Sequence, residues 1–197
     1  EPWKIYPQPI RQFNQAVIIP SYGESDYLPQ SLASLEKNDS SLLQDTLVIV
    51  VVNHGEDADE FFKNDNEKTL KFLSSSEFHF TLGIVDATKP GMELPSKKAG
   101  VGLARKIGMD LALQHLKDKS SLIFCTDADT TVDSQYLKTV LNYFKQNNAN
   151  AAVVGFCHLI PEDTNLAHTI KEYEKFLLNL PDLPKKEIDK KEIYIYH

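Results

Sequence analysis

The chain of 197 residues is long enough to form one domain with a sizeable core, and its composition, 42% apolar and 25% charged, is that of a globular protein. The formal net charge is -7 and the basic residues are interleaved with acidic ones, which disfavours a general nucleic-acid-binding protein. No apolar stretch approaches the ~20 residues that a transmembrane helix needs, and no segment reads as a signal peptide. We therefore expect a cytoplasmic protein, either free or peripheral at a membrane.

Apolar runs alternate along the chain with segments whose apolar residues recur at helical spacing. Strands are predicted at 16–20 (AVIIP), 46–53 (TLVIVVVN), 78–85, 121–126 (SLIFCT) and 151–157 (AAVVGFC). Helices are predicted between and after them, at 25–37, 57–75, 99–116, 136–144 and 165–178. This alternation is typical of βαβ units, so we expect an α/β fold with a mainly parallel, Rossmann-like sheet and helices on both faces.

Two features concern the organisation of the chain. Cys125 and Cys157 both fall inside apolar runs, so we expect two buried thiols in strands, without a disulfide, in a reducing compartment. We expect residues 1–180 to form one domain. Residues 181–197 are rich in charge and end in IYIYH, which fits an edge strand, a partner contact or the start of a further segment equally well.

Polar and ionisable residues gather where the predicted strands end, in the sequences PSYGE, NHGED, VDATK, TDADT and CHLIPED. In an open parallel sheet, ligands bind in the crevice at the carboxyl ends of the strands. The sequence therefore predicts a polar binding crevice at this edge of the sheet.

Two aspartates, Asp127 and Asp129, follow the fourth predicted strand directly. In extended backbone they would face the same side, on the order of 6.5 Å apart. Such close like charges raise each other's pKa unless a cation relieves them, and hard oxygen ligands suit Mg²⁺ or Mn²⁺. The alternative is that Asp129 or Asp133 only caps the helix that begins near Tyr136.

Two other stretches point to the same crevice. Gly100 and Gly102 allow close backbone approach at a helix start, where free amides favour an anion, and Lys98 and Arg105 add cations nearby. The alternative is an ordinary amphipathic helix with a solvated basic face. The first strand ends in IIPSYGES, which forms either a ligand-binding loop or an ordinary turn with no role in binding.

These segments, in this order, resemble the family 2 glycosyltransferases, which have the GT-A fold. The family motif P-x-Y-N-E is matched by PSYGE at 20–24, and its D-D-G-S by NHGE at 53–56. Its N-x-G and A-R-N-x-G are matched by KAG at 98–100 and ARKIG at 104–108, and its D-x-D by DAD at 127–129. The resemblance spans about residues 16–156.

The resemblance implies an enzyme that transfers a sugar, with inversion, from a UDP- or GDP-linked donor to an unknown glycan, lipid or protein acceptor. It implies Mn²⁺ or Mg²⁺ as the cofactor, held by Asp129. The nucleotide-sugar would be bound by residues from four segments: Pro20, Tyr22, Glu24, Asn53, Lys98, Arg105 and Asp127. Of these, Lys98 and Arg105 would contact the base or the diphosphate, and Asp127 the ribose.

Three departures from the family pattern bear on function. Asn53 replaces an acid that the family uses on the nucleobase, and Gly23 replaces an asparagine. The family places its catalytic base, an Asp often preceded by Glu, well beyond the D-x-D. Here Asp163 is a candidate that also reads as part of a helix start, and His158 is a candidate that also reads as a hydrogen-bonded histidine. We therefore expect a donor-binding half that lacks part of its acceptor-binding segment.

Two other functions fit parts of the sequence. LIFCTDADTTV also matches the first motif of haloacid-dehalogenase-type phosphatases, with Asp127 as nucleophile, Asp129 as general acid and Mg²⁺ as cofactor. That motif normally lies near the start of its domain, whereas three predicted strands precede it here. A non-catalytic nucleotide-sugar-binding domain is the other alternative.

Overall fold

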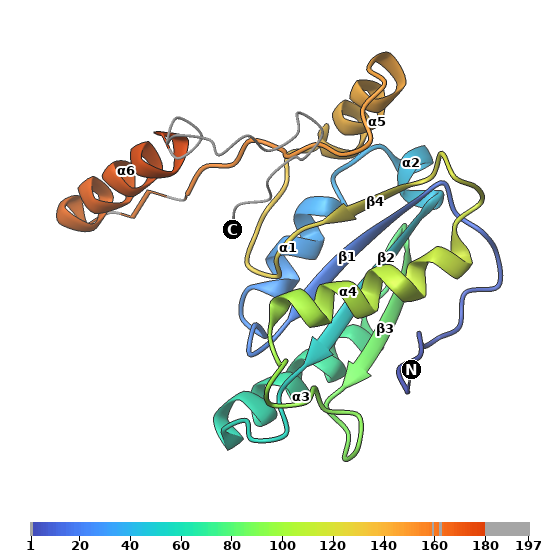
Figure 1. Ribbon diagram of the computed structural model, residues 1–197, viewed down its shortest axis with the longest axis vertical. Helices are drawn as coiled ribbons and strands as arrows, with labels where there is room; N and C mark the ends of the chain where they lie inside the picture. The colour runs from blue at the N-terminus through green and yellow to red at the C-terminus, as the bar shows by residue number, and fades with distance from the viewer. Residues whose placement is uncertain (1, 159, 162, 180–197) are drawn as a thin grey trace. The chain divides into compact units, whose positions relative to one another are not determined.

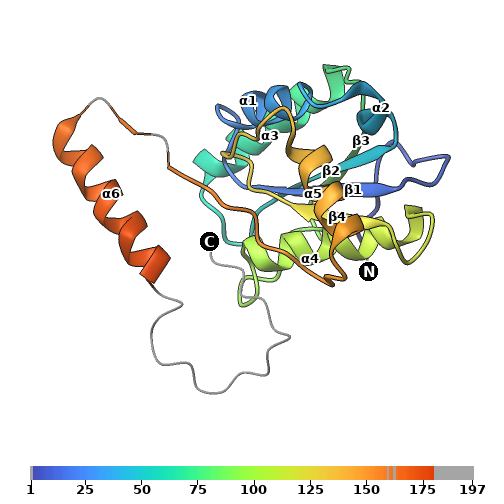
Figure 2. The same cartoon turned by 90° about the horizontal axis from the view of Figure 1, so that it is seen from above.

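The computed structural model describes residues 2–158, 160–161 and 163–179 (Figures 1 and 2). The chain divides into two compact units, residues 1–142 and the part from Tyr143 onward. The helices and strands follow in the order β1 (Gln15–Ser21), α1 (Leu28–Leu35), α2 (Ser40–Gln44), β2 (Thr46–Asn53), α3 (Glu60–Ser75), β3 (Thr81–Ala87), α4 (Val101–Ala112), the 3₁₀ helix η1 (Leu113–His115), β4 (Leu122–Cys125), α5 (Tyr136–Gln146) and α6 (Thr164–Asn179).

The first unit is built on a parallel sheet of four strands in the order β3-β2-β1-β4. Every residue of β1 and β2 is buried, which explains why both strands are continuous apolar runs rather than alternating ones. The chain proceeds from β1 to β2 and β3 on one side and returns to place β4 on the other. This reversal next to β1 is the topological switch point at which such sheets bind ligands.

Successive side chains of the central strand point to opposite faces of the sheet and enter two separate cores. Val17 and Ile19 pack in the core that α1 and α3 cover, and Ala16 and Ile18 in the core beneath α4. The two views show α4 on one face of the sheet and α1 and α3 on the other (Figures 1 and 2). A Cβ at Gly108 of α4 would lie 2.5 Å from Ile18 Cγ2, so glycine lets this helix approach the sheet closely. The expected parallel α/β sheet with helices on both faces is confirmed.

The prediction of a fifth strand at 151–157 is wrong. This run has no strand assignment, its residues are exposed, and no described strand pairs with it. Its β-branched residues favour extended backbone, but a strand also needs a hydrogen-bonded neighbour. The short helix α2 was not predicted from the sequence. Residues 181–197 lie outside the described residues.

The expectation of two buried thiols is also wrong, because Cys125 and Cys157 are both exposed. Cys125 is the last residue of a four-residue strand at the edge of the sheet, and Cys157 lies in the segment that forms no strand. An apolar run in the sequence does not ensure burial where neighbouring strands are short or absent. None of the helices in the described part of the chain has the length and apolar character required to cross a bilayer.

Candidate functional site

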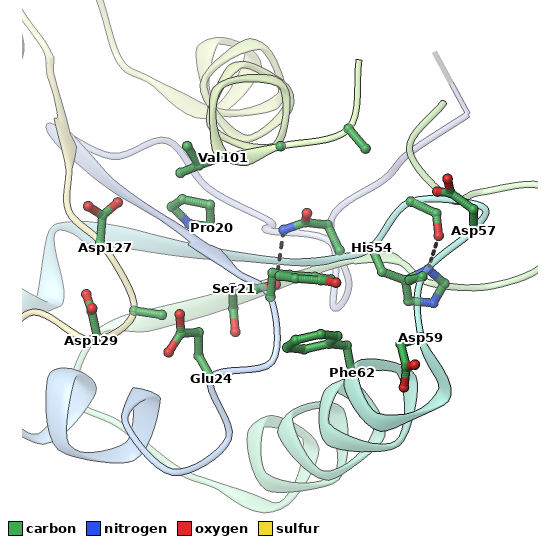
Figure 3. A pocket seen from close by; sticks show the side chains of 17 residues that line it. Pro20, Ser21, Glu24, His54, Asp57, Asp59, Phe62, Val101, Asp127 and Asp129 are labelled. Atoms are coloured by element: carbon green, nitrogen blue, oxygen red, sulfur yellow. Dashed lines mark hydrogen bonds between the residues drawn. The ribbon is translucent and has the colours of Figure 1, made fainter. Parts of the chain in front are cut away.

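A pocket of about 630 Å³ opens where β1, β2 and β4 end and α4 begins (Figure 3). Its lining comes from all four of these segments and from the start of α3: Pro20, Ser21, Tyr22, Glu24, Asn53, His54, Gly55, Asp57, Ala58, Asp59, Phe62, Ala99, Gly100, Val101, Asp127, Ala128 and Asp129. The pocket lies at the carboxyl edge of the sheet, next to the switch point, where the sequence predicted a crevice.

The structure brings most of the predicted binding residues together in this pocket: Pro20, Tyr22, Glu24, Asn53, Asp127 and Asp129. Lys98 and Arg105 are not among its lining residues. Lys98 is exposed next to the lining residue Ala99, and its backbone N donates to Pro95 O at 2.7 Å. Arg105 reaches the pocket indirectly, through Asp127.

The D-x-D segment forms a turn and not the extended backbone expected from the sequence. Strand β4 ends at Cys125, and Thr130 N donates to Asp127 O at 3.2 Å across the two residues between them. Ala128 is 2% exposed and packs into the core beneath, so both aspartates are left at the pocket. Of Asp129 and Asp133, the two residues expected as a possible helix cap, Asp133 forms a turn just before α5: its Oδ1 accepts from Gln135 N at 2.7 Å and its backbone O from Tyr136 N at 3.0 Å.

One end of the pocket carries a surplus of negative charge. Figure 3 shows Glu24, Asp127 and Asp129 together at this end. Burial, followed by the charges of Asp129, Asp65 and Asp127, raises the pKa of Glu24. Arg105 offsets part of this charge, since its Nη2 donates to Asp127 Oδ1 at 2.6 Å and its side chain is only 12% exposed. Among the described residues, no cation lies within ion-pair distance of Asp129.

This end offers hard oxygen donors but not a complete metal site. No group of three or more His, Cys, Asp or Glu in the described part of the chain is arranged to hold a metal ion. Asp129 and Glu24 supply carboxylates of the type that Mg²⁺ and Mn²⁺ prefer. The pKa of Glu24 is raised first by burial and then by neighbouring negative charges, and a cation would relieve the second effect. The residues therefore fit a divalent ion that shares its coordination with a bound ligand, as Mg²⁺ does with phosphates.

The opposite end of the pocket is aromatic. The rings of Tyr22 and Phe62 are stacked, with centroids 4.6 Å apart and planes at 24°. Burial, followed by the charges of Asp59 and Asp57, raises the pKa of Tyr22. Asp59 also caps α3, because its Oδ1 accepts from Phe61 N at 2.7 Å. The aromatic pair presents a flat surface of the kind on which a nucleobase stacks.

Asn53 and the start of α4 also line the pocket. Asn53 is 3% exposed, and its Nδ2 donates to Ser21 O at 3.0 Å and to Val51 O at 3.1 Å, so its amino group ties the ends of β1 and β2 together. Helix α4 begins at the pocket after Gly100, which has φ of 151°. The first amides of a helix have no partner within it, which makes this end suitable for an anion.

The two candidates for a catalytic base lie in the second unit and contact α6. Asp163 Oδ1 accepts from Leu166 N at 2.9 Å, which is the geometry of a helix cap. His158 donates its backbone N to Glu174 Oε1 at 2.6 Å, and its Nδ1 lies 3.0 Å from the same oxygen. These hydrogen bonds from His158 lower the pKa of Glu174. Both candidates therefore have a structural role within their own unit.

Sequence reasoning pointed to Gly100 at this crevice but missed several other residues that line the pocket: Ser21, His54, Gly55, Asp57, Ala58, Asp59, Phe62, Ala99, Val101 and Ala128. Most of them are direct neighbours of predicted site residues, or of a predicted strand end, and could have been found by extending those segments. Phe62 is different, because it comes from within α3. A signal for it exists in the recurrence of Phe62, Asp65 and Asn66 at helical spacing, which places them on one face.

No protein-family model and no curated protein sequence matches this chain. Among solved structures, S. aureus TarS 1–349 in complex with UDP matches with a TM-score of 0.50 and 17% identity, over 76% of this chain and 39% of that one. S. aureus TarS 1–349 matches with a TM-score of 0.49 and 18% identity, over 72% of this chain and 38% of that one. Its complex with UDP-GlcNAc matches with a TM-score of 0.48 and 16% identity, over 76% and 38%.

The chain thus spans less than two fifths of the length of these TarS structures. At this level of identity the likeness concerns the fold. The order of strands and the helices on both faces belong to an α/β, Rossmann-like and GT-A-like fold, which this chain shares with the glycosyltransferase TarS over the matched part.

Proposed function

We propose that this chain is the donor-binding part of a glycosyltransferase of the family 2 type. The observation that carries the proposal is a single pocket that combines a carboxylate end, a helix start and a stacked aromatic pair at the switch point of the sheet. A nucleoside-diphosphate sugar has matching parts, because it joins a flat base to a doubly charged diphosphate.

The reaction would be a displacement at the anomeric carbon of the donor sugar, with inversion. An acceptor oxygen forms a bond to this carbon, the bond from the carbon to the diphosphate oxygen breaks, and the electron pair leaves with the nucleoside diphosphate. The acceptor's proton passes to a base, for which Asp163 and His158 stay predictions. A bound Mn²⁺ or Mg²⁺ would offset the charge that develops on the leaving diphosphate.

Each end of the pocket has a part in this scheme. Asp129 would hold the metal ion, and Arg105 would fix the orientation of Asp127 near the ribose through their ion pair. Free amides at the start of α4 would face the diphosphate. Tyr22, stacked on Phe62, would receive the base.

The donor would be linked to UDP or GDP, and the acceptor would be a glycan, lipid or protein. Support for a uridine donor comes from the TarS structures, which are described as complexes with UDP and with UDP-GlcNAc. Asn53 stands where the family has an acid that contacts the nucleobase, and its amide nitrogen already donates to two carbonyl oxygens. This position therefore does not select uracil over guanine, and GDP remains a candidate.

The proposal is tested by three assays on one preparation of the protein: binding of UDP and GDP with Mn²⁺, release of nucleoside diphosphate from UDP-GlcNAc and other nucleotide sugars, and release of phosphate from a simple phosphomonoester. We expect binding of one nucleotide and no phosphate release. Steady phosphate release that is lost in Asp127→Asn would support the phosphatase alternative. Binding without sugar transfer or donor hydrolysis, even in a longer form of the chain, would support a non-catalytic binding domain.

A further inference from the structure

Helix α3 turns a polar stripe toward the interior of the molecule. Asp65, Asn66 and Thr69 form this stripe, and Phe62 lies three residues before Asp65 on the same face of the helix. Asp65, Asn66 and Thr69 are 7%, 0% and 1% exposed. Burying polar groups is costly unless they are hydrogen-bonded, so their partners indicate what the stripe does.

Asn66 connects two segments that line the pocket, the loop after β1 and the end of β2. Its Oδ1 accepts from Gly23 N at 3.0 Å, in the loop after β1. Its Nδ2 donates to Asn53 O at 2.9 Å, at the end of β2. A backbone N–H and a backbone carbonyl are thus both satisfied by one buried amide, which fixes the distance between the two segments.

Asp65 holds the same loop one residue beyond Glu24. Its Oδ2 accepts from Ser25 N at 2.9 Å and its Oδ1 from Ser25 Oγ at 2.5 Å. Burial opposes its ionisation, but the hydrogen bonds from Ser25 and the charge of Lys68 hold the pKa of Asp65 below its usual value. The carboxylate is therefore ionised at neutral pH and bonds strongly to the loop.

Phe62 closes the remaining side of the loop. A Cβ at Gly23 would lie 2.5 Å from Phe62 Cδ1, and Gly23 has φ of 68°, a conformation that side chains other than glycine rarely adopt. The same ring stacks on Tyr22. The side chains of α3 therefore hold the loop at Tyr22, Gly23 and Ser25. The carboxylate of Glu24, between them, faces the pocket (Figure 3).

We propose that Asn66 and Asp65 are positioning residues for the nucleotide: they do not line the pocket, yet they hold Tyr22 and Glu24 in the arrangement that binds it. The inference rests on the proposed function for the identity of the ligand. The arrangement itself, a loop fixed by the buried face of α3, follows from the hydrogen bonds alone.

The test uses Asn66→Ala, the milder variant Ser25→Ala, and Thr69→Val as a matched control. Thr69 lies on the same buried stripe, but within the described part of the chain its hydroxyl bonds only to Asp65 O, inside α3, at 3.3 Å. Three quantities are measured for each protein: the dissociation constants for UDP and GDP with Mn²⁺, hydrogen exchange of peptides covering residues 20–28, and the melting temperature.

We expect Asn66→Ala to weaken nucleotide binding about tenfold or more and to accelerate exchange in the loop peptides. Ser25→Ala keeps the bond from its backbone N and should weaken binding about threefold. Thr69→Val should lower the melting temperature while leaving affinity and loop exchange unchanged. The control variant is also expected to be less stable. If only Asn66→Ala and Ser25→Ala change the nucleotide affinity, the cause is therefore the position of the loop and not a general loss of stability.

Two results would overturn the inference. One is unchanged loop exchange in Asn66→Ala and Ser25→Ala; the other is faster loop exchange with unchanged nucleotide affinity. If the unmodified protein binds neither nucleotide, the proposed function fails, and hydrogen exchange alone then decides whether α3 fixes the loop.

Discussion

The two ends of the pocket differ in charge and in origin. The carboxylate end is built by the turn after β4 together with Glu24, and Arg105 offsets the charge of Asp127. The aromatic end is built by Tyr22 on Phe62, from the loop after β1 and from α3. One end suits a cation with an anionic ligand, and the other suits a flat ring. Ligand affinity should therefore divide into a part that depends on metal and a part that does not.

The largest expected effect comes from removing the carboxylate of Asp129. Asp129→Ala should abolish the increase in nucleotide affinity that Mn²⁺ produces, because the variant loses its proposed metal ligand. The free energy of unfolding should change by less than about 0.5 kcal/mol, since Asp129 is exposed and supports no packing. Titration calorimetry and thermal unfolding measure the two quantities. Asp133→Ala serves as the control, because the Asp133 side chain bonds in the turn before α5 and does not line the pocket.

At the aromatic end, a mutation should weaken nucleotide binding equally with and without the metal ion. Tyr22→Ala removes the ring on which a base would stack, and base–aromatic stacking contributes about 1–3 kcal/mol. Affinity for UDP or GDP should therefore fall by the same factor with and without Mn²⁺. Tyr27→Ala is the control, because that side chain is exposed and not part of the lining. A loss seen only with Mn²⁺ would contradict the division of the pocket into two independent ends.

A smaller effect is expected in the pH dependence of stability. The pKa of Glu24 is raised in the folded protein, so its contribution to stability is fully present below the unfolded pKa and is lost as pH rises through the folded value. Glu24→Gln should remove this loss. Urea unfolding of both proteins from about pH 4 to about pH 7 gives the difference, which should grow with pH in favour of the variant. A difference that stays constant over this range would show that the pKa is not raised.

The smallest effect on the pocket is expected from Asp163. Asp163→Ala should lower the stability of α6 by about 1 kcal/mol, whereas Asp163→Asn should leave it nearly unchanged, because asparagine caps helices as well as aspartate does. Circular dichroism during thermal unfolding measures the change. Nucleotide affinity should be unchanged in both variants. If sugar transfer is detected and Asp163→Asn abolishes it, Asp163 is more than a cap.

The sequence was informative where structure follows from the backbone and from burial. The continuous apolar runs at β1 and β2 predicted two buried parallel strands, and the strand ends predicted the edge of the sheet that carries the pocket. The predictions failed where strand formation or burial depended on a neighbouring strand. Residues 151–157 have the composition of a strand but no described strand beside them, and Cys125 is exposed because β4 is a short edge strand.

In the candidate site, too, residues marked by a local sequence pattern were predicted, whereas contacts between distant segments were not. Asp127 and Asp129 were found because a D-x-D stands out after an apolar run, but the turn between them depends on the burial of Ala128. The ion pair between Arg105 and Asp127 joins segments 22 residues apart, and the bond from Gly23 N to Asn66 joins segments 43 residues apart. No local pattern in the sequence specifies such contacts, because they follow from the packing of α3 and α4 on the sheet.

The most direct measurement of the central claim is calorimetric titration of UDP and of GDP into the unmodified protein, each with and without Mn²⁺. The two-ended pocket predicts that one of the nucleotides binds, more tightly with Mn²⁺ than without it. Absence of binding by either nucleotide, with or without the metal, would contradict the claim that this pocket receives a nucleotide-sugar donor.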